Sequence, residues 1–156
     1  MPTNEPNGGT MKAPEMSSKQ ARERVEKKDW KPRNAVWELT LACNLQCQHC
    51  GSSAGKARAN ELSLDECLTV ADHLGEMGAE LVTLSGGEPT LKRGWDKIAR
   101  RLNDHGILTN MVTNGYYRGR TDVATIAQQA LDAGMCNVGI SIDGSEDVHE
   151  TIRGKG

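Results

Sequence analysis

The sequence predicts an α/β fold built around a parallel sheet, and two observations carry this prediction. Apolar segments of strand length alternate with amphipathic segments of helix length, in the order β-α-β-α-β-α-β. This alternation is typical of right-handed βαβ units. Polar or glycine-bearing segments also follow each predicted strand. Parallel α/β folds place ligands and catalytic groups at the carboxyl ends of their strands, so we expect one composite site there.

The boundaries of the predicted elements can be given in order. Residues 35–41 form the first predicted strand. The first helix begins after Ser63, because Ser63 and Glu66 have the spacing of a capping box, and Gly78 stands where a C-terminal cap belongs. The later elements are a strand at 80–84, a helix at 95–104, a strand at 107–112, a helix at 121–133 and a strand at 137–142.

The two ends of the chain differ from this regular middle. Residues 1–33 are polar and poor in apolar side chains, which predicts disorder, with a short charged helix possible at 18–29. The folded domain is therefore expected at 34–156. That domain contains four predicted strands and stops abruptly, so we expect a truncated N-terminal part of a larger domain.

Composition excludes several classes of function. The 156 residues carry 19 Lys and Arg against 21 Asp and Glu, with no basic stripe of the kind that binds nucleic acid. No apolar run approaches the roughly 18 residues of a membrane span, and the N-terminus lacks the apolar core of a secretory signal. Five cysteines without such a signal indicate reduced thiols, metal or redox chemistry, and a cytoplasmic location.

A cluster of three cysteines after the first strand is the strongest chemical signal. Cys43, Cys47 and Cys50 have the spacing C-x3-C-x2-C. Thiolates at such spacing suit an iron–sulfur cluster or zinc. Three ligands leave one iron of a four-iron cluster open, unless a fourth protein ligand exists. A zinc site completed by His49 or Cys67 is the alternative.

This cysteine spacing and the Gly86-Gly87-Glu88-Pro89 segment after the second strand together resemble the radical S-adenosylmethionine (SAM) enzymes. The resemblance implies a partial (β/α)6 TIM-like barrel, of which about four β/α units are present. The segments 37–40, 113–115 and 141–144 resemble the subgroup that modifies peptides or proteins or builds cofactors.

The resemblance implies a specific chemistry. Cys43, Cys47 and Cys50 would bind a [4Fe-4S] cluster whose fourth iron is chelated by SAM. Reductive cleavage would give a 5′-deoxyadenosyl radical that abstracts hydrogen from a peptide or small-molecule substrate. An electron donor such as flavodoxin or ferredoxin is implied as a partner. The cofactors carry the difficult chemistry, and the protein orients them.

The resemblance also assigns roles in SAM binding to residues of the first two loops. His49 matches a position whose backbone meets the adenine; the alternatives are an exposed loop histidine and a zinc ligand. Gly86 and Gly87 would let the backbone approach the methionyl ammonium, because they lack a Cβ atom. Glu88 would add negative charge beside that cation, and Pro89 would stiffen the turn.

Residues after the third and fourth strands complete the expected cofactor site. Ser141 and Asp143 match a position that hydrogen-bonds the ribose or the methionyl carboxylate, although an ordinary strand cap explains them too. Thr113 and Asn114 are weaker candidates, for which an ordinary turn is an equal alternative. His149 and Arg153 resemble a family segment but receive no role, because a charged, solvated helix start explains them about as well.

Residues outside these motifs give further expectations. Alternation along the first strand places Glu38 and Thr40 on one face, and we expect both to point into the barrel lumen. Cys67 should pack in the core and Cys136 should be structural. Two other functions stay open: a non-catalytic zinc- or cluster-binding module, and an inactive fragment of a radical SAM enzyme.

Overall fold

The computed structural model describes Ser17 and residues 31–117 and 122–155. The chain divides into two units, residues 1–30 and 31–156, and every element named below lies in the second. Most of the predicted disordered segment 1–33, and the possible helix at 18–29, fall outside the described residues. Arg33 is described: its carbonyl accepts hydrogen bonds from the N–H groups of Glu80 (3.3 Å) and Leu81 (2.9 Å).

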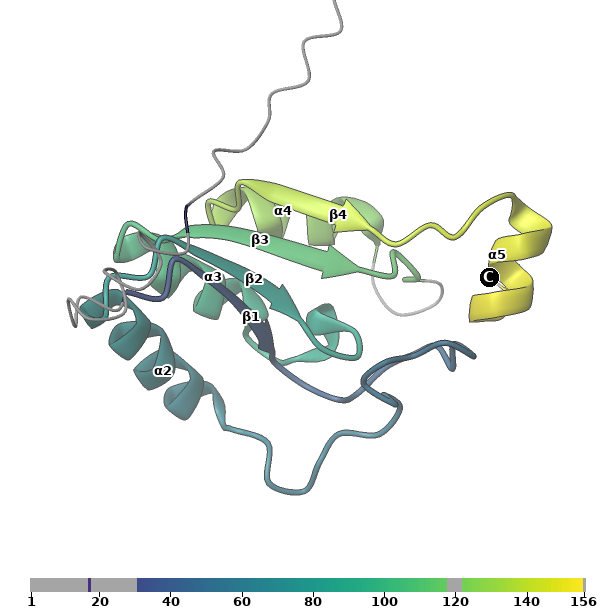
Figure 1. Cartoon of the computed structure of the whole chain (residues 1–156), viewed down its shortest axis with the longest axis horizontal. Coiled ribbons are helices and arrows are strands. Elements are labelled where there is room, and N and C mark those ends of the chain that lie inside the picture. The colour runs from purple at the N-terminus through teal and green to yellow at the C-terminus, as the bar shows by residue number, and fades with distance from the viewer. Residues whose placement is uncertain (1–16, 18–30, 118–121, 156) are drawn as a thin grey trace, which may run out of the picture. The chain divides into compact units, whose positions relative to one another are not determined.

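The sheet is parallel, as predicted. Within the described residues its strands are β1 (Asn34–Glu38), β2 (Leu81–Ser85), β3 (Leu108–Thr113) and β4 (Asn137–Ile140), hydrogen-bonded in the order β1-β2-β3-β4 (Figure 1). Every neighbouring pair runs parallel. Consecutive strands therefore lie side by side, as in a barrel wall, and the predicted α/β class is confirmed.

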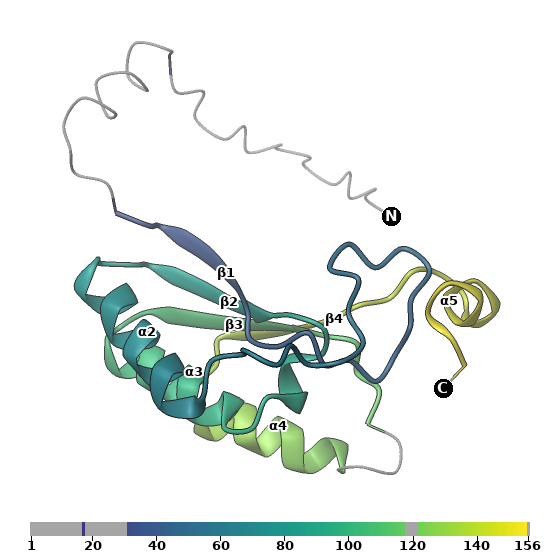
Figure 2. The same ribbon diagram turned by 90° about the horizontal axis from the view of Figure 1, so that it is seen from below.

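Helices cover one face of this sheet (Figure 2). They are α2 (Leu64–Glu76), α3 (Trp95–Asp104) and α4 (Val123–Asp132). The predicted capping box of α2 is confirmed, because the Ser63 hydroxyl accepts from the Glu66 N–H and the Glu66 carboxylate accepts from the Ser63 N–H. Among the described residues, no helix is both long and apolar enough to cross a bilayer.

The core lies between the sheet and these helices. Val82 and Leu84 of β2, Met111 of β3, and Ile98 and Leu102 of α3 are all buried. Burial of this apolar area is the main force that fixes the helices on the sheet. Side chains on the other face are exposed or partly exposed, among them Val36, Leu108 and Val112.

Two cysteines, Cys67 and Cys136, lie outside the cluster of Cys43, Cys47 and Cys50. Cys67 on α2 is 1% exposed within the core, which confirms its predicted packing. Cys136 precedes β4, and its side chain is exposed.

The structure differs from the predicted elements in three places. β1 ends at Glu38 rather than at residue 41, because residues 40–42 leave the sheet and bond to the loop after β2. The short 3-10 helix η1 (Pro89–Leu91) was not predicted, and the helix α5 (Glu146–Arg153) was expected only as a possible charged helix start. β4 ends at Ile140 rather than at residue 142, and all four of its residues are exposed at the edge of the sheet.

Candidate functional site

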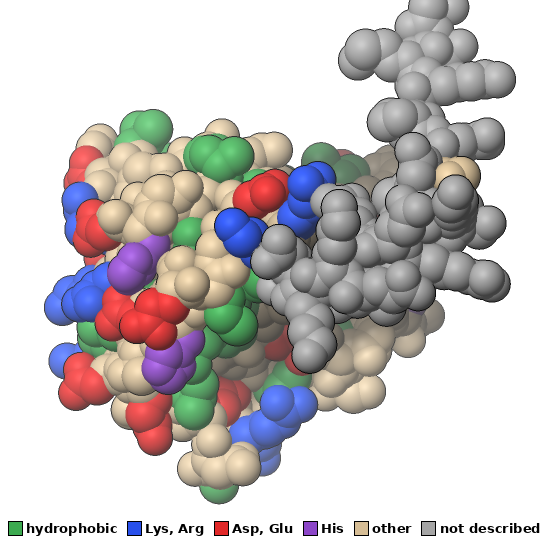
Figure 3. All heavy atoms as spheres, turned by 60° about the vertical axis from the view of Figure 1, so that its left-hand side comes forward, with side chains coloured by type: hydrophobic (Ala, Val, Ile, Leu, Met, Phe, Trp, Pro, Cys, Tyr) green, Lys and Arg blue, Asp and Glu red, His purple; other side chains and the backbone are tan. Residues whose placement is uncertain are grey.

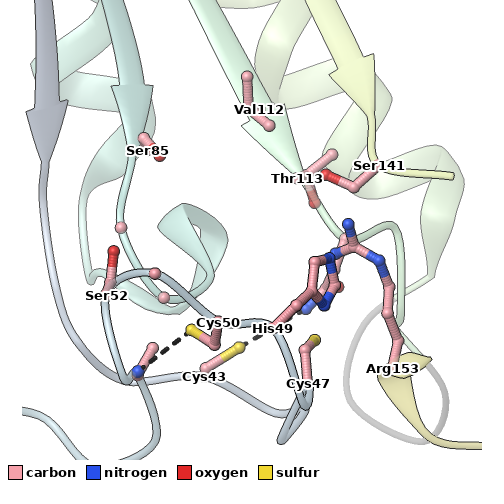
Figure 4. A pocket seen from close by; sticks show the side chains of 15 residues that line it. Cys43, Cys47, His49, Cys50, Ser52, Ser85, Val112, Thr113, Ser141 and Arg153 are labelled. Carbon is pink, nitrogen blue, oxygen red and sulfur yellow. Dashed lines mark hydrogen bonds between the residues drawn. The ribbon is translucent and has the colours of Figure 1, made fainter. Parts of the chain in front are cut away.

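Segments that follow all four strands line one cavity of about 250 Å³ (Figure 4). This is near the lower end of the size of ligand pockets, roughly 300–1,000 Å³. The predicted site residues that line it are Cys43, Cys47, His49, Cys50, Gly86, Gly87, Thr113, Asn114 and Ser141. Glu88, Pro89 and Asp143 were predicted with them but do not line the cavity.

The three clustered cysteines belong to one loop, the cysteine loop (residues 42–55). A parallel bridge between Ala42 and Gly55 closes the base of this loop. Inside it, the Cys50 N–H donates to the Cys47 carbonyl (3.2 Å) in a tight turn. The three thiols are therefore carried by one compact element and face the same cavity.

Two of the thiols accept hydrogen bonds from neighbouring groups. The Ala54 N–H donates to Cys50 Sγ (3.3 Å), and the side-chain amide of Asn114 donates to Cys43 Sγ (3.8 Å). Such bonds stabilise the thiolate form and orient a ligating sulfur. Asn114 is thus a link between the loop after β3 and the first cysteine.

The third thiol is in a different environment. Burial raises the pKa of Cys47, the positive charge of Arg153 acts in the opposite direction, and the neighbouring thiols raise it further.

Within the described residues, no tight group of three His, Cys, Asp or Glu side chains surrounds a single point. The three thiols instead line the cavity together. A soft, all-sulfur donor set around a cavity suits an iron–sulfur cluster.

The glycines of the loop after β2 dock against the main chain that leads into the cysteine loop. The N–H groups of Gly87 and Glu88 donate to the carbonyls of Thr40 (2.7 Å) and Ala42 (2.8 Å). A Cβ atom on Gly86 would lie 2.4 Å from the Thr40 oxygen, and one on Gly87 would lie 2.4 Å from the Ala42 oxygen. Both glycines are therefore required by this contact between two backbones, a reason that the sequence did not reveal.

The Glu88 carboxylate points into the protein rather than into the cavity. The side chain is fully buried and accepts hydrogen bonds from the Thr90 hydroxyl (2.7 Å), the Thr113 hydroxyl (2.8 Å) and the Asn114 N–H (2.9 Å). It joins the loops after β2 and β3. Pro89 is also buried and begins η1.

Residues after β4 form a charged group on the far side of the cavity. Arg153 lines the cavity and forms an ion pair with Asp143, in which Nη2 lies 3.2 Å from Oδ1 and Nε also donates. This partner holds the pKa of Asp143 below its usual range. The Nε2 atom of His49 lies 3.6 Å from the same carboxylate. Ser141 lines the cavity, and its N–H donates to the Thr113 carbonyl (3.0 Å).

The two residues of the first strand differ in outcome. Glu38 lies on the helix-free face, in agreement with strand alternation, but its side chain is exposed; it accepts a hydrogen bond from the hydroxyl of Ser52, which lines the cavity. The prediction for Thr40 is wrong. Thr40 is buried beyond the end of β1, where strand alternation no longer applies, and its hydroxyl donates to Glu61 (2.8 Å) just before α2.

Sequence reasoning missed three residues that shape the site. Asn44 accepts from the Asn114 side chain (2.8 Å). Gln48 connects the cysteine loop to the end of α5, and Arg153 of α5 lines the cavity together with Cys47. The resemblance of the segment around Arg153 to a family segment was the one available signal, because these contacts join residues about 100 positions apart.

Comparison with known proteins agrees with this geometry. Residues 37–156 match the radical SAM superfamily. The mycofactocin maturase MftC of Mycolicibacterium smegmatis is 35% identical over 78% of this chain and 30% of its own length. The AdoMet-dependent heme synthase of Methanosarcina barkeri is 36% identical over 79% of this chain and 35% of its own length. The chain thus spans about a third of these relatives.

A solved structure shares the fold. SuiB of Streptococcus suis, bound to its precursor peptide SuiA, superposes with a TM-score of 0.69 and 19% identity, covering 88% of this chain and 31% of SuiB. The same protein bound to S-adenosylmethionine gives the same TM-score. At this identity the likeness concerns the fold alone.

Proposed function

The chain belongs to the radical SAM superfamily, and on that premise we propose that it binds a [4Fe-4S] cluster through Cys43, Cys47 and Cys50 and binds SAM in the adjoining cavity. The observation that carries the proposal is that these three thiols line one cavity together with the glycine loop after β2. When bound and reduced, such a cluster supplies the electron that cleaves SAM to a 5′-deoxyadenosyl radical.

The residues of the chain then have distinct tasks. The three thiolates would hold three irons of the cluster and would leave the fourth iron free to bind SAM. Gly86 and Gly87 line the cavity, and their missing Cβ atoms let this part of the wall lie against the main chain of Thr40 and Ala42.

Other groups act one step further from the cofactors. Glu88 acts through the loops it joins, since its carboxylate bonds to Thr90, Thr113 and Asn114. The Asp143 carboxylate neutralises Arg153 beside the cavity and faces His49. Ser141 adds a hydroxyl at the cavity wall.

For the substrate we propose a peptide, with flavodoxin or ferredoxin as the class of electron donor. The support is that the PqqA peptide cyclase of Bradyrhizobium diazoefficiens is 34% identical to this chain over 74% of the chain's length. The helix-free face of the sheet offers room for such a substrate, because Val36 and Val112 on that face are exposed and Val112 also lines the cavity. A small-molecule substrate is the alternative, since a heme synthase is also among the relatives.

Anaerobic reconstitution of the 156-residue chain tests the proposal. We expect a brown protein with about four irons per chain, and 5′-deoxyadenosine after addition of dithionite and SAM. Replacing Cys43, Cys47 and Cys50 together by Ala should abolish iron binding and cleavage. Cys136→Ala, an exposed thiol outside the loop, is the matched control and should change neither.

Two results would contradict the proposal. A colourless protein with one zinc per chain would favour the zinc-binding module. Undiminished SAM cleavage by the triple variant would show that the cysteine loop does not hold the reactive cluster. Iron uptake without cleavage would separate cluster binding from activity and would favour the inactive-fragment alternative.

A further inference from the structure

Helix α5 contacts the cysteine loop directly. The N–H of Gln48 donates to the Ile152 carbonyl (2.9 Å), and the side-chain amide of Gln48 donates to the Thr151 carbonyl (2.9 Å). Figure 1 shows α5 set apart from the sheet, and Figure 2 shows it beside the cysteine loop. Gln48 thus bonds to the end of α5, where helix carbonyls lack partners within the helix.

A second contact lies at the same end of the helix. Arg153, the last residue of α5, enters the cavity that Cys47 lines (Figure 4) and forms its ion pair with Asp143. Because Asp143 follows β4, this pair fixes the end of α5 relative to the sheet. Cys47 therefore lies next to two anchored residues. One is Gln48, which is bonded to α5, and the other is Arg153, which is paired with Asp143.

The rest of the cysteine loop is held differently. Its base is closed by the Ala42–Gly55 bridge, and Cys43 is bonded to Asn114. The part around Cys47 is the farthest along the chain from these anchors. Gln48 itself is exposed, so burial does not hold it in position. The two hydrogen bonds to α5 hold it instead.

Helix α5 depends on the same contacts. It has eight residues, none of them buried. A helix this short is marginal by itself in water. The loop and the helix therefore order each other, and loosening one should loosen the other by the same coupling.

We infer that α5 is a positioning element for Cys47, with Gln48 and Arg153 as the positioning residues that hold this part of the cysteine loop. The inference rests on the proposed function in one respect, that Cys47 is a cluster ligand. The contact itself needs no cluster, so it can be tested on the metal-free chain.

Amide hydrogen exchange of the metal-free 156-residue chain tests the contact. We expect the Gln48 N–H to be protected, and Arg153→Leu to speed its exchange about three- to fivefold, the factor that a partly exposed ion pair can supply. Arg101→Leu is the matched control. It also breaks an Arg–carboxylate pair, with Asp72 (3.0 Å), but on the helix layer, and should leave Gln48 unchanged.

A second variant tests the reverse direction. Gln48→Ala removes the bond to Thr151 without touching any charge. Amides within α5, such as those of His149 and Gly154, should then exchange faster. On the reconstituted protein, both Arg153→Leu and Gln48→Ala should speed the removal of iron by a chelator, whereas Arg101→Leu should not.

Amide exchange and iron removal together separate the inference about α5 from the proposed function. If Gln48 exchanges at the rate of an unprotected amide, or if neither variant alters exchange across the contact, α5 does not position the loop and the inference is overturned. It is also overturned if exchange changes but iron removal does not. Failure of the unaltered chain to take up iron refutes the proposed function instead, whatever the exchange data show.

Discussion

Two loops line the cavity from neighbouring strands, and they are built in opposite ways. The loop after β2 docks main chain on main chain and ends in the buried Glu88 and Pro89. The cysteine loop is half-exposed. Main-chain bonds close only its base, between Ala42 and Gly55, and its interior is held at separate points, by Asn114 at Cys43 and by Gln48 toward α5. The first loop is part of the folded framework, whereas the second can be altered without changing that framework.

The largest effect should come from Gly87→Ala. Its Cβ would lie 2.4 Å from the Ala42 carbonyl oxygen, and main-chain atoms cannot move aside as a side chain can. We expect a loss of about 3 kcal/mol in the free energy of unfolding, measured by urea denaturation. Gly55→Ala, where a Cβ meets nothing within 4 Å, should cost less than about 0.5 kcal/mol. Equal losses of unfolding free energy in the two variants would show that the two loops do not differ in how tightly their main chains are packed.

Glu88→Gln should have the next largest effect. The amide cannot accept all the hydrogen bonds that Thr90, Thr113 and Asn114 donate to the buried carboxylate. One donor is left facing an NH2 group, at a cost of about 2 kcal/mol. Thermal unfolding of the metal-free chain measures this loss. An unchanged melting temperature would mean that Glu88 is not the link between the two loops.

Glu61 gives a pH-dependent effect at the entrance to the cysteine loop. Burial acts to raise its pKa, but hydrogen bonds from the Leu41 N–H (2.7 Å), the Thr40 hydroxyl and the Arg58 N–H (3.1 Å) outweigh it, so the pKa of Glu61 is lowered. A lowered folded-state pKa stabilises the protein above the unfolded value of about 4.3. That stability is lost as the pH falls through the lower folded-state value.

The corresponding variant is Glu61→Gln. It should cost about 1 kcal/mol near pH 6, and its difference from the unaltered chain should narrow as the pH falls below about 4. Urea denaturation at several pH values measures this. A difference that stays constant with pH would show that the charge of Glu61 does not hold the loop.

Asn114→Ala should have the smallest effect on stability, about 0.5 kcal/mol. It removes the hydrogen bonds that the side-chain amide donates to Cys43 Sγ (3.8 Å) and Asn44 (2.8 Å) and the one it accepts from the Tyr116 N–H (2.8 Å), but it keeps the Asn114 N–H bonded to Glu88. In the reconstituted protein we expect a lower midpoint potential, because hydrogen bonds to ligating sulfurs favour the reduced cluster. An unchanged potential would show that Cys43 does not depend on this residue.

The sequence alone determined the fold class and the chemistry that the family shares. The alternation of apolar periods predicted the parallel sheet, since secondary structure and hydrophobic burial follow from local pattern. The spacing of Cys43, Cys47 and Cys50 and the glycines after β2 indicated the cofactors, because those motifs are short and continuous. The sequence also predicted the helix caps at Ser63 and Gly78.

The tertiary structure alone decided where the predicted site residues lie and which groups they contact. Strand alternation placed Glu38 correctly but failed for Thr40, because β1 ends where the main chain turns to meet Gly87. The sequence predicted that the Glu88 carboxylate faces a ligand, whereas in the structure it accepts hydrogen bonds from Thr90, Thr113 and Asn114 inside the protein. The approach of α5 to Gln48 depends on the path of the chain after β4, which no local pattern contains.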